Sequence, residues 1–142
     1  MNAWSQLPNA VHIDRVIESM KDRPEVWGAA WTNTARNMTW DAAQWAARDA
    51  ALDAASTAGR NTARHAATNA ACRGAWDEAR DAARYAAWFV VAALVAWDDS
   101  SQFLELDGDA LEIYARLSDD PRAILLLPAV RAFERIKELE TV

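Results

Sequence analysis

The sequence predicts an all-α protein, a compact bundle of about six to seven helices with alanine-rich, closely packed central helices. Three observations lead to this fold class. Ala-Ala pairs recur every four residues through the middle of the chain, apolar residues flank them at helical spacing, and the 142 residues include only 4 glycines and 4 prolines. Few turn residues favour long helices. The length suits one core, so we expect a single domain over residues 1–142.

Two amphipathic segments precede the repeat. Over residues 8–21, apolar residues recur at helical spacing from Val11 to Met20, which predicts a first helix. Pro24, with Glu25 in the first turn behind it, opens a second and shorter helix that fades at residues 34–37.

The repeat occupies residues 40–97, and eight of its Ala-Ala pairs, from Ala42-Ala43 to Ala86-Ala87, fall on one count of four. Four residues turn a helix through about 400°, so the alanine stripe drifts by about 40° in each repeat. Because no flat partner could follow that drift, we expect breaks at residues 58–61 and at Arg73-Gly74. The expected helices cover residues 40–58, 61–73 and 75–97, the last two either separate or continuous, and tryptophans fill the space that alanine leaves.

The excess charge of the chain lies in residues 98–120, an acidic connecting region with eight acids against Arg116 alone, whereas residues 1–39 and 40–97 each sum to zero. Within it, Asp109 and Glu112 predict a capping box for a helix through Leu117. Asp120-Pro121 predicts the start of a C-terminal helix over residues 121–140, bent at Pro128, whose broad apolar stripe packs on the repeat helices.

Cysteine usage and hydropathy favour a cytoplasmic protein that does not enter membranes. The single Cys72 cannot form an internal disulfide, which suits a reducing compartment, and the first residues lack the basic and apolar runs of a secretory signal. The longest uncharged stretch, residues 85–97, has 13 residues. A membrane-spanning helix needs about 20, so we expect a buried helix there.

Groups suited to catalysis or metal binding are few, and we expect no metal and no cofactor. The two histidines and one cysteine occur in none of the spacings CxxC, HxxxH or HExxH. They are His12, His65 and Cys72. Two carboxylate pairs one helical turn apart could serve acid-base chemistry, but neighbouring arginines favour salt bridges along a helix surface. These pairs are Asp49 with Asp53 and Asp77 with Asp81.

The stretch WDAAQWAARDAALDAA, residues 40–55, resembles the Ala/Trp-rich tracts of small helical proteins from bacteria and their phages. Some of these proteins are grouped as Imm-5-like toxin-immunity proteins. The resemblance covers residues 40–97 and implies an α-helical fold and a role in conflict between bacteria and mobile elements. It transfers no functional residue.

The leading hypothesis is a non-enzymatic binding protein, an immunity or anti-defence factor that occupies a protein partner with a basic surface. The acidic region would attract that partner electrostatically. The expected binding residues are the acids of this region that are not needed to cap a helix. These are Asp98, Asp99, Glu105, Asp107 and Asp119. Direct nucleic-acid binding is not expected, because acids balance the arginines of the repeat. The alternatives are a self-assembling helical protein, hence a homo-oligomer, and a small enzyme with an interhelical carboxylate or His65 site.

Overall fold

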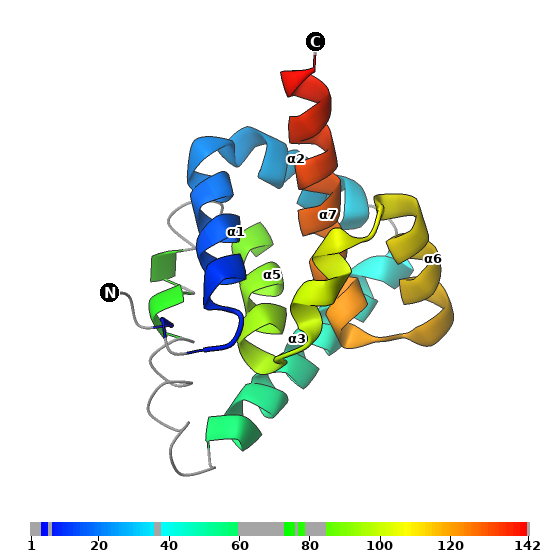
Figure 1. Cartoon of the computed structure of the whole chain (residues 1–142). Coiled ribbons are helices and arrows are strands. Elements are labelled where there is room, and N and C mark those ends of the chain that lie inside the picture. The colour runs from blue at the N-terminus through cyan, green and yellow to red at the C-terminus, as the bar shows by residue number, and fades with distance from the viewer. Residues whose placement is uncertain are drawn as a thin grey trace.

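A computed structural model describes residues 4–5, 7–35, 38–59, 73–75, 77–78 and 85–141 (Figure 1). The described elements are α1 (Ala10–Asp22), α2 (Pro24–Ala35), α3 (Met38–Gly59), α5 (Tyr85–Ala96), the 3-10 helix η2 (Ser100–Glu105), α6 (Gly108–Ser118) and α7 (Pro121–Glu140). Every one of these described elements is a helix, which confirms the predicted all-α fold. None of the described helices has both the length and the apolar character needed to cross a membrane.

Helix α7 is the common packing partner of the fold. It contacts α2, α3, α5, α6 and η2, and in Figure 1 the other helices are arranged around it. Its first half is buried on all sides, with every residue from Ala123 to Val130 inaccessible to solvent or nearly so. A helix surrounded by neighbours needs apolar residues all round, which explains why the run AILLLPAV lacks a polar face. The predicted packing of this helix on the repeat is confirmed for α3 and α5.

The predicted helix starts and ends agree well with the structure where it describes them. Pro24 begins α2, and α3 ends at Gly59, within the expected break. Asp120 is the N-cap of α7, where its side chain accepts a hydrogen bond of 2.9 Å from the amide of Arg122, and Pro121 follows as the first helical residue. The expected helix over residues 61–73 lies outside the described residues except at Arg73. The expected break at Arg73-Gly74 is wrong, because residues 73–75 are helical. Whether this helix continues into α5 lies outside the described residues.

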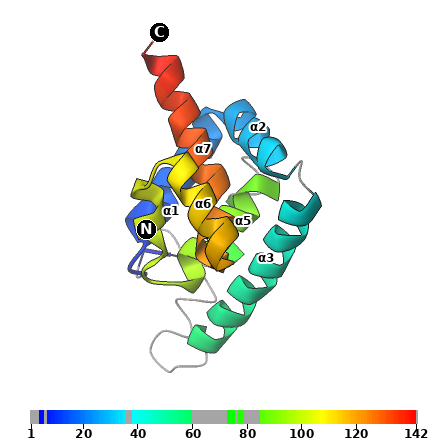
Figure 2. The same cartoon turned by 90° about the vertical axis from the view of Figure 1, so that its right-hand side faces the viewer.

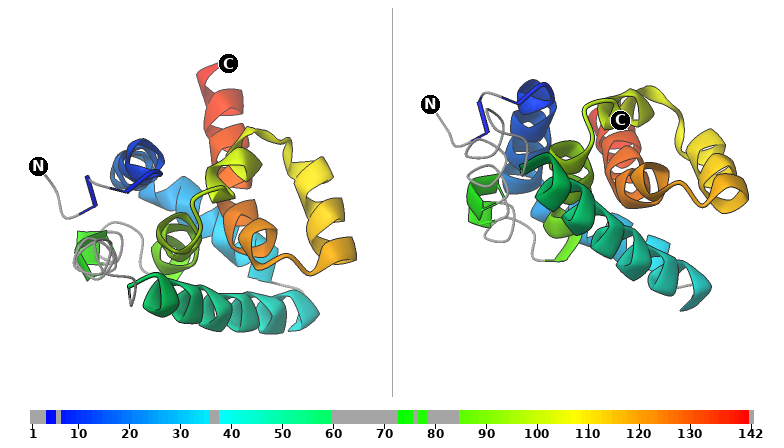
Figure 3. Two further views of the ribbon diagram at one scale, coloured as in Figure 1. Left: turned by 60° about the horizontal axis from the view of Figure 1, so that its bottom comes forward. Right: turned by 90° about the horizontal axis from the view of Figure 1, so that it is seen from below.

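The alanine repeat faces the core along only part of its surface. Ala47, Ala51 and Ala55 recur every four residues on the buried side of α3, whereas Ala42 and Ala46 are exposed. Helix α3 crosses α5 and α7, and both views in Figure 3 show it running along one side of them. Small side chains at such a crossing let the helix axes come close together.

One polar side chain is enclosed beside these alanines. Gln44 is fully buried in α3, and its amide nitrogen and oxygen have no hydrogen-bond partner among the described residues. A buried amide without partners costs about 1–3 kcal/mol of stability. Glutamine suits a solvent-facing position, so its burial here reflects the helices that cross α3.

Candidate partner-binding surface

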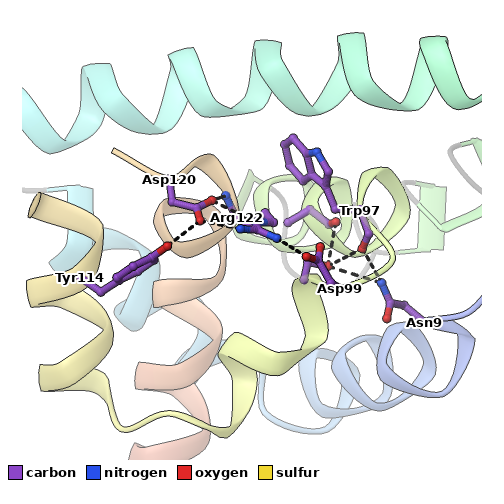
Figure 4. Close-up of polar contacts among 8 residues, drawn as sticks. Asn9, Trp97, Asp99, Tyr114, Asp120 and Arg122 are labelled. Carbon is purple, nitrogen blue, oxygen red and sulfur yellow. Dashed lines mark hydrogen bonds and ion pairs between the residues drawn. The ribbon is translucent and has the colours of Figure 1, made fainter. Parts of the chain in front are cut away.

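The acidic region folds as a turn, η2 and α6, and both η2 and α6 pack against α7. Asn9 fixes its start from the opposite end of the chain, as Figure 4 shows. The buried amide nitrogen of Asn9 donates hydrogen bonds of 2.9 Å to the carbonyl of Leu94 and 2.7 Å to that of Trp97. The hydroxyl of Ser100 lies 2.8 Å from the same Trp97 oxygen. These side chains satisfy carbonyls that the end of α5 would otherwise leave unpaired.

Arg122 joins the two ends of the region. Its guanidinium forms ion pairs of 2.5 Å with Asp99 and 2.8 Å with Asp120, and Tyr114 donates a hydrogen bond of 2.9 Å to Asp120 (Figure 4). The Arg122 hydrogen bond holds the pKa of Asp99 below its ordinary value. Burial alone would raise the pKa of Asp120, but hydrogen bonds from Arg122 and Tyr114 outweigh it and lower that pKa. The same contacts raise the pKa of Arg122. The Asp99–Arg122 ion pair therefore joins the turn after α5 to the start of α7.

The N-cap of α6 is Asp107, so the predicted capping box at Asp109 and Glu112 is wrong. Asp107 accepts a hydrogen bond of 2.7 Å from the amide of Ala110. Glu112 instead lies 3.7 Å from Arg131, which also pairs with Asp109 at 3.1 Å. The helix begins two residues early because Asp107 has the extended backbone of a cap residue and Gly108 already lies inside the helix.

Gly108 allows α6 to approach α7 closely. Its amide donates a hydrogen bond of 3.0 Å to the carboxylate of Glu134 in α7. A Cβ atom at this position would lie 2.3 Å from the Glu134 carboxylate and 2.4 Å from the Arg131 guanidinium, so any other residue would displace both side chains.

The remaining predicted residues lie apart from one another. Glu105 forms an exposed ion pair of 3.5 Å with Arg15 of α1, and Asp98 is exposed in the turn after α5. Asp119 is the C-cap of α6 and adopts the left-handed conformation with φ of 54°, which glycine or asparagine usually occupies. The structure thus separates the predicted residues into a corner at Asp98 and Asp99, a contact with α1, and the two ends of α6 at Asp107 and Asp119.

Along α6, and at Leu106 just before its N-cap, lies an apolar surface that the sequence analysis missed. The exposed fractions are 42% for Leu106, 60% for Ile113, 40% for Tyr114 and 82% for Leu117. We call these four residues the outer face of α6. In Figure 1 this helix lies at the right-hand edge of the molecule, and in Figure 2, which looks onto that side, it faces the viewer. At 100° per residue, Ile113 and Leu117 lie opposite the buried Leu111 and Ala115, so α6 carries two apolar sides.

A hollow of about 340 Å³ adjoins the outer face of α6 and is lined by Gln102, Phe103, Leu106, Tyr114 and Arg122. The rings of Phe103 and Tyr114 stack at 5.5 Å, and the Arg122 guanidinium lies 5.1 Å from the centre of the Phe103 ring. Stacking and the ion pairs of Arg122 fix these side chains, so the hollow is preformed.

The other groups considered for catalysis do not converge in the described residues. His65, Cys72 and Asp81 lie outside that part of the chain, and Asp49 is an exposed residue 4.0 Å from Arg48. Within the described ranges, no three His, Cys, Asp or Glu side chains lie close enough together to hold a metal ion.

The fold and surface define a class of protein: an all-α scaffold that presents an acid-flanked apolar helix. Comparison of the chain with protein-family models, with curated protein sequences and with solved structures gave no match.

Proposed function

We propose that this protein is a non-enzymatic binding protein that occupies a protein partner with a basic surface through the outer face of α6. The observation that carries the proposal is the exposure of large apolar side chains on a rigid helix whose two ends carry acids. Contiguous exposed apolar surface with a polar rim is typical of interaction sites, and it is costly to keep in water otherwise.

The acidic residues near the outer face of α6 indicate which kind of partner would bind there. Arginines of neighbouring helices pair with Asp99, Asp109 and Glu112, but no ion pair with a described residue holds Asp107 or Asp119. Both carboxylates are exposed, but Asp119 lies against alanines of α3, so Asp107 is the one available beside the outer face of α6 to Lys or Arg side chains of a partner. Nucleic acid would meet the same carboxylates with its phosphates and be repelled. Occupying a basic protein surface is how an immunity or anti-defence factor of the kind that the repeat resembles would act.

Capture from lysate of the source cell, followed by kinetics with the purified partner, tests the proposal. The disruptive variant is I113S/L117S, and the matched control is V11S, because Val11 is 73% exposed on α1. We expect wild type and V11S to retain a basic protein that I113S/L117S releases. Association with the purified partner should slow as salt is added, because screening weakens steering between exposed charges.

Equal retention of the partner by all three proteins would contradict the proposal. Turnover of a captured small molecule, unaffected by I113S/L117S, would support the enzyme hypothesis in its place. Both double and single serine variants replace exposed residues, so their melting temperatures are expected to stay close to that of wild type and serve as the folding control.

A further inference from the structure

The chain contains one Asp-Gly pair, Asp107-Gly108, and no Asn-Gly pair. In an Asp-Gly pair, the main-chain nitrogen of the glycine can attack the side-chain carboxyl group of the aspartate before it. The succinimide ring that forms reopens to aspartate or to isoaspartate. Glycine favours this reaction because it has no side chain to hinder the attack and leaves the backbone free to turn. The pair is therefore the point of the sequence most open to a spontaneous chemical change.

The contact between α6 and α7 requires glycine at this position for a separate reason. Gly108 is buried, and a Cβ atom there would displace the side chains of Glu134 and Arg131, both of which hold α6 against α7. A residue that hindered the reaction would therefore also disturb the packing of α6. The close approach of the two helices keeps a reactive pair in the chain, so the fold has to slow the reaction in another way.

Two hydrogen bonds hold the two reacting groups apart. The amide nitrogen of Gly108, which is the nucleophile, donates a hydrogen bond of 3.0 Å to the carboxylate of Glu134. The carboxylate of Asp107, which would be attacked, accepts a hydrogen bond of 2.7 Å from the amide of Ala110 and is directed toward the first turn of α6. For the reaction to start, the carboxyl group must leave this cap and the nitrogen must leave Glu134. Both steps require local opening at the start of α6.

We infer that Asp107-Gly108 is an isoaspartate-forming site that the native fold suppresses, and that Glu134 is the positioning residue that keeps it closed. In the first step, the Gly108 nitrogen forms a bond to Cγ of Asp107, and its proton leaves with the carboxyl hydroxyl group as water. Water then opens the ring. Attack at Cγ restores aspartate, whereas attack at the main-chain carbonyl carbon gives isoaspartate. The sequence of steps is neutral in electrons and consumes only the water that it released.

Isoaspartate would loosen the start of α6. The main chain then runs through Cβ and Cγ of residue 107, so it is one carbon longer, and the free carboxylate sits on Cα. The former side chain no longer caps the Ala110 amide, and the Gly108 amide is moved away from Glu134. The modified protein should melt about 3–5 °C lower, the usual effect of a lost N-cap in a chain of this size. This inference goes beyond the proposed function and does not depend on it.

The first test compares folded wild type with the same protein in urea, both incubated at neutral pH. Trypsin releases residues 85–116 as one peptide, in which chromatography separates isoaspartate from aspartate and electron-transfer fragmentation locates it. We expect isoaspartate at position 107 to form at least about tenfold more slowly in the folded protein. Asp99-Ser100 lies in the same peptide and serves as the internal reference for general unfolding.

Variants of α7 test the role of Glu134. E134A removes the acceptor of the Gly108 amide and should form isoaspartate about tenfold faster than folded wild type, as expected for a lost hydrogen bond to a charged group. E134Q keeps an oxygen that can accept the same hydrogen bond, so it should restore most of the protection. The matched control is E138A, which removes an exposed carboxylate that pairs with Arg135 and should react as wild type does.

Equal rates in folded and urea-unfolded wild type would overturn the inference, because the fold would then give no protection. A rate in E134A that equals that of wild type would remove Glu134 from it. A slower rate in E134A would reverse its role, since the carboxylate would then act as a base that promotes the attack. Equal acceleration in E134A and E138A, or equal acceleration at Asp99-Ser100 and Asp107-Gly108, would assign the effect to general loosening and contradict the specific role of Glu134.

Discussion

Asp119 is expected to weaken the fold, and D119G should recover the lost stability. A left-handed backbone costs an ordinary residue roughly 1–2 kcal/mol, and aspartate tolerates it better than most. A carboxylate beside the last carbonyls of a helix costs about 0.3–1 kcal/mol more. Glycine removes both penalties but loses about 0.5–1 kcal/mol through the freedom of the unfolded chain. The net gain is about 1 kcal/mol, or about 3–5 °C in melting temperature for a chain of this size.

Urea unfolding followed by circular dichroism at neutral pH measures this gain. D119N is the matched variant, because asparagine keeps the tolerance of positive φ and removes only the charge, so its gain should be limited to the helix-dipole part. A loss of stability in both variants would show that the carboxylate supports the fold.

Three further expectations concern the core and the Arg122 corner. Q44M should raise the free energy of unfolding by about 1–3 kcal/mol, because it replaces an amide that has no hydrogen-bond partner among the described residues by an apolar side chain of similar size; a destabilised variant would reveal a partner for the amide. A51L should cost about 1–3 kcal/mol in the same urea assay, since that alanine is buried, whereas A42L on the exposed side should change little; similar effects at both sites would contradict the packing described for α3. R122M should flatten the acid sensitivity of the fold. The two aspartates that pair with Arg122 have lowered pKa values, so the stability that they contribute is present above about pH 4 and is lost as pH falls further. If wild type and R122M lose the same stability on acidification, other carboxylates cause the acid unfolding.

Local signals made most of the fold predictable. Proline at a helix start, glycine at a helix end and the Asp120-Pro121 cap each act within a few residues, and α2, α3 and α7 begin or end where these signals indicate. The buried alanines of α3 follow from the four-residue period in the same way. Which stretch of that period reaches the core depends on the helices that cross it, so the burial of Gln44 could not be derived from the repeat.

The sequence predicted the charge of the candidate surface but not its ion pairs or its exposed apolar side, because these depend on tertiary contacts. Charge along the chain identified the acidic region, but not which acids neighbouring helices neutralise. Asp99 is paired by Arg122, which lies 23 positions away in sequence, and Asp109 is paired by Arg131 across the α6–α7 contact. The two apolar sides of α6 were visible in the spacing of Leu111, Ile113 and Leu117, yet periodicity cannot say which side stays open. That choice is made by tertiary packing alone.

The central place of α7 also has a consequence for the order in which the molecule assembles. Helices α2, α3, α5 and α6 all pack on it, and it follows all of them in the chain, so none can complete its buried surface before α7 is present. Asn9 is bound to Leu94, 85 positions further along the chain, so the first helix too waits for a distant segment. Folding slows as contacts span longer stretches of chain, and this protein should therefore fold more slowly than bundles whose successive helices pair as hairpins. During synthesis, the apolar sides of its early helices stay exposed until residues 121–140 emerge, a period in which chaperone binding and aggregation compete with folding.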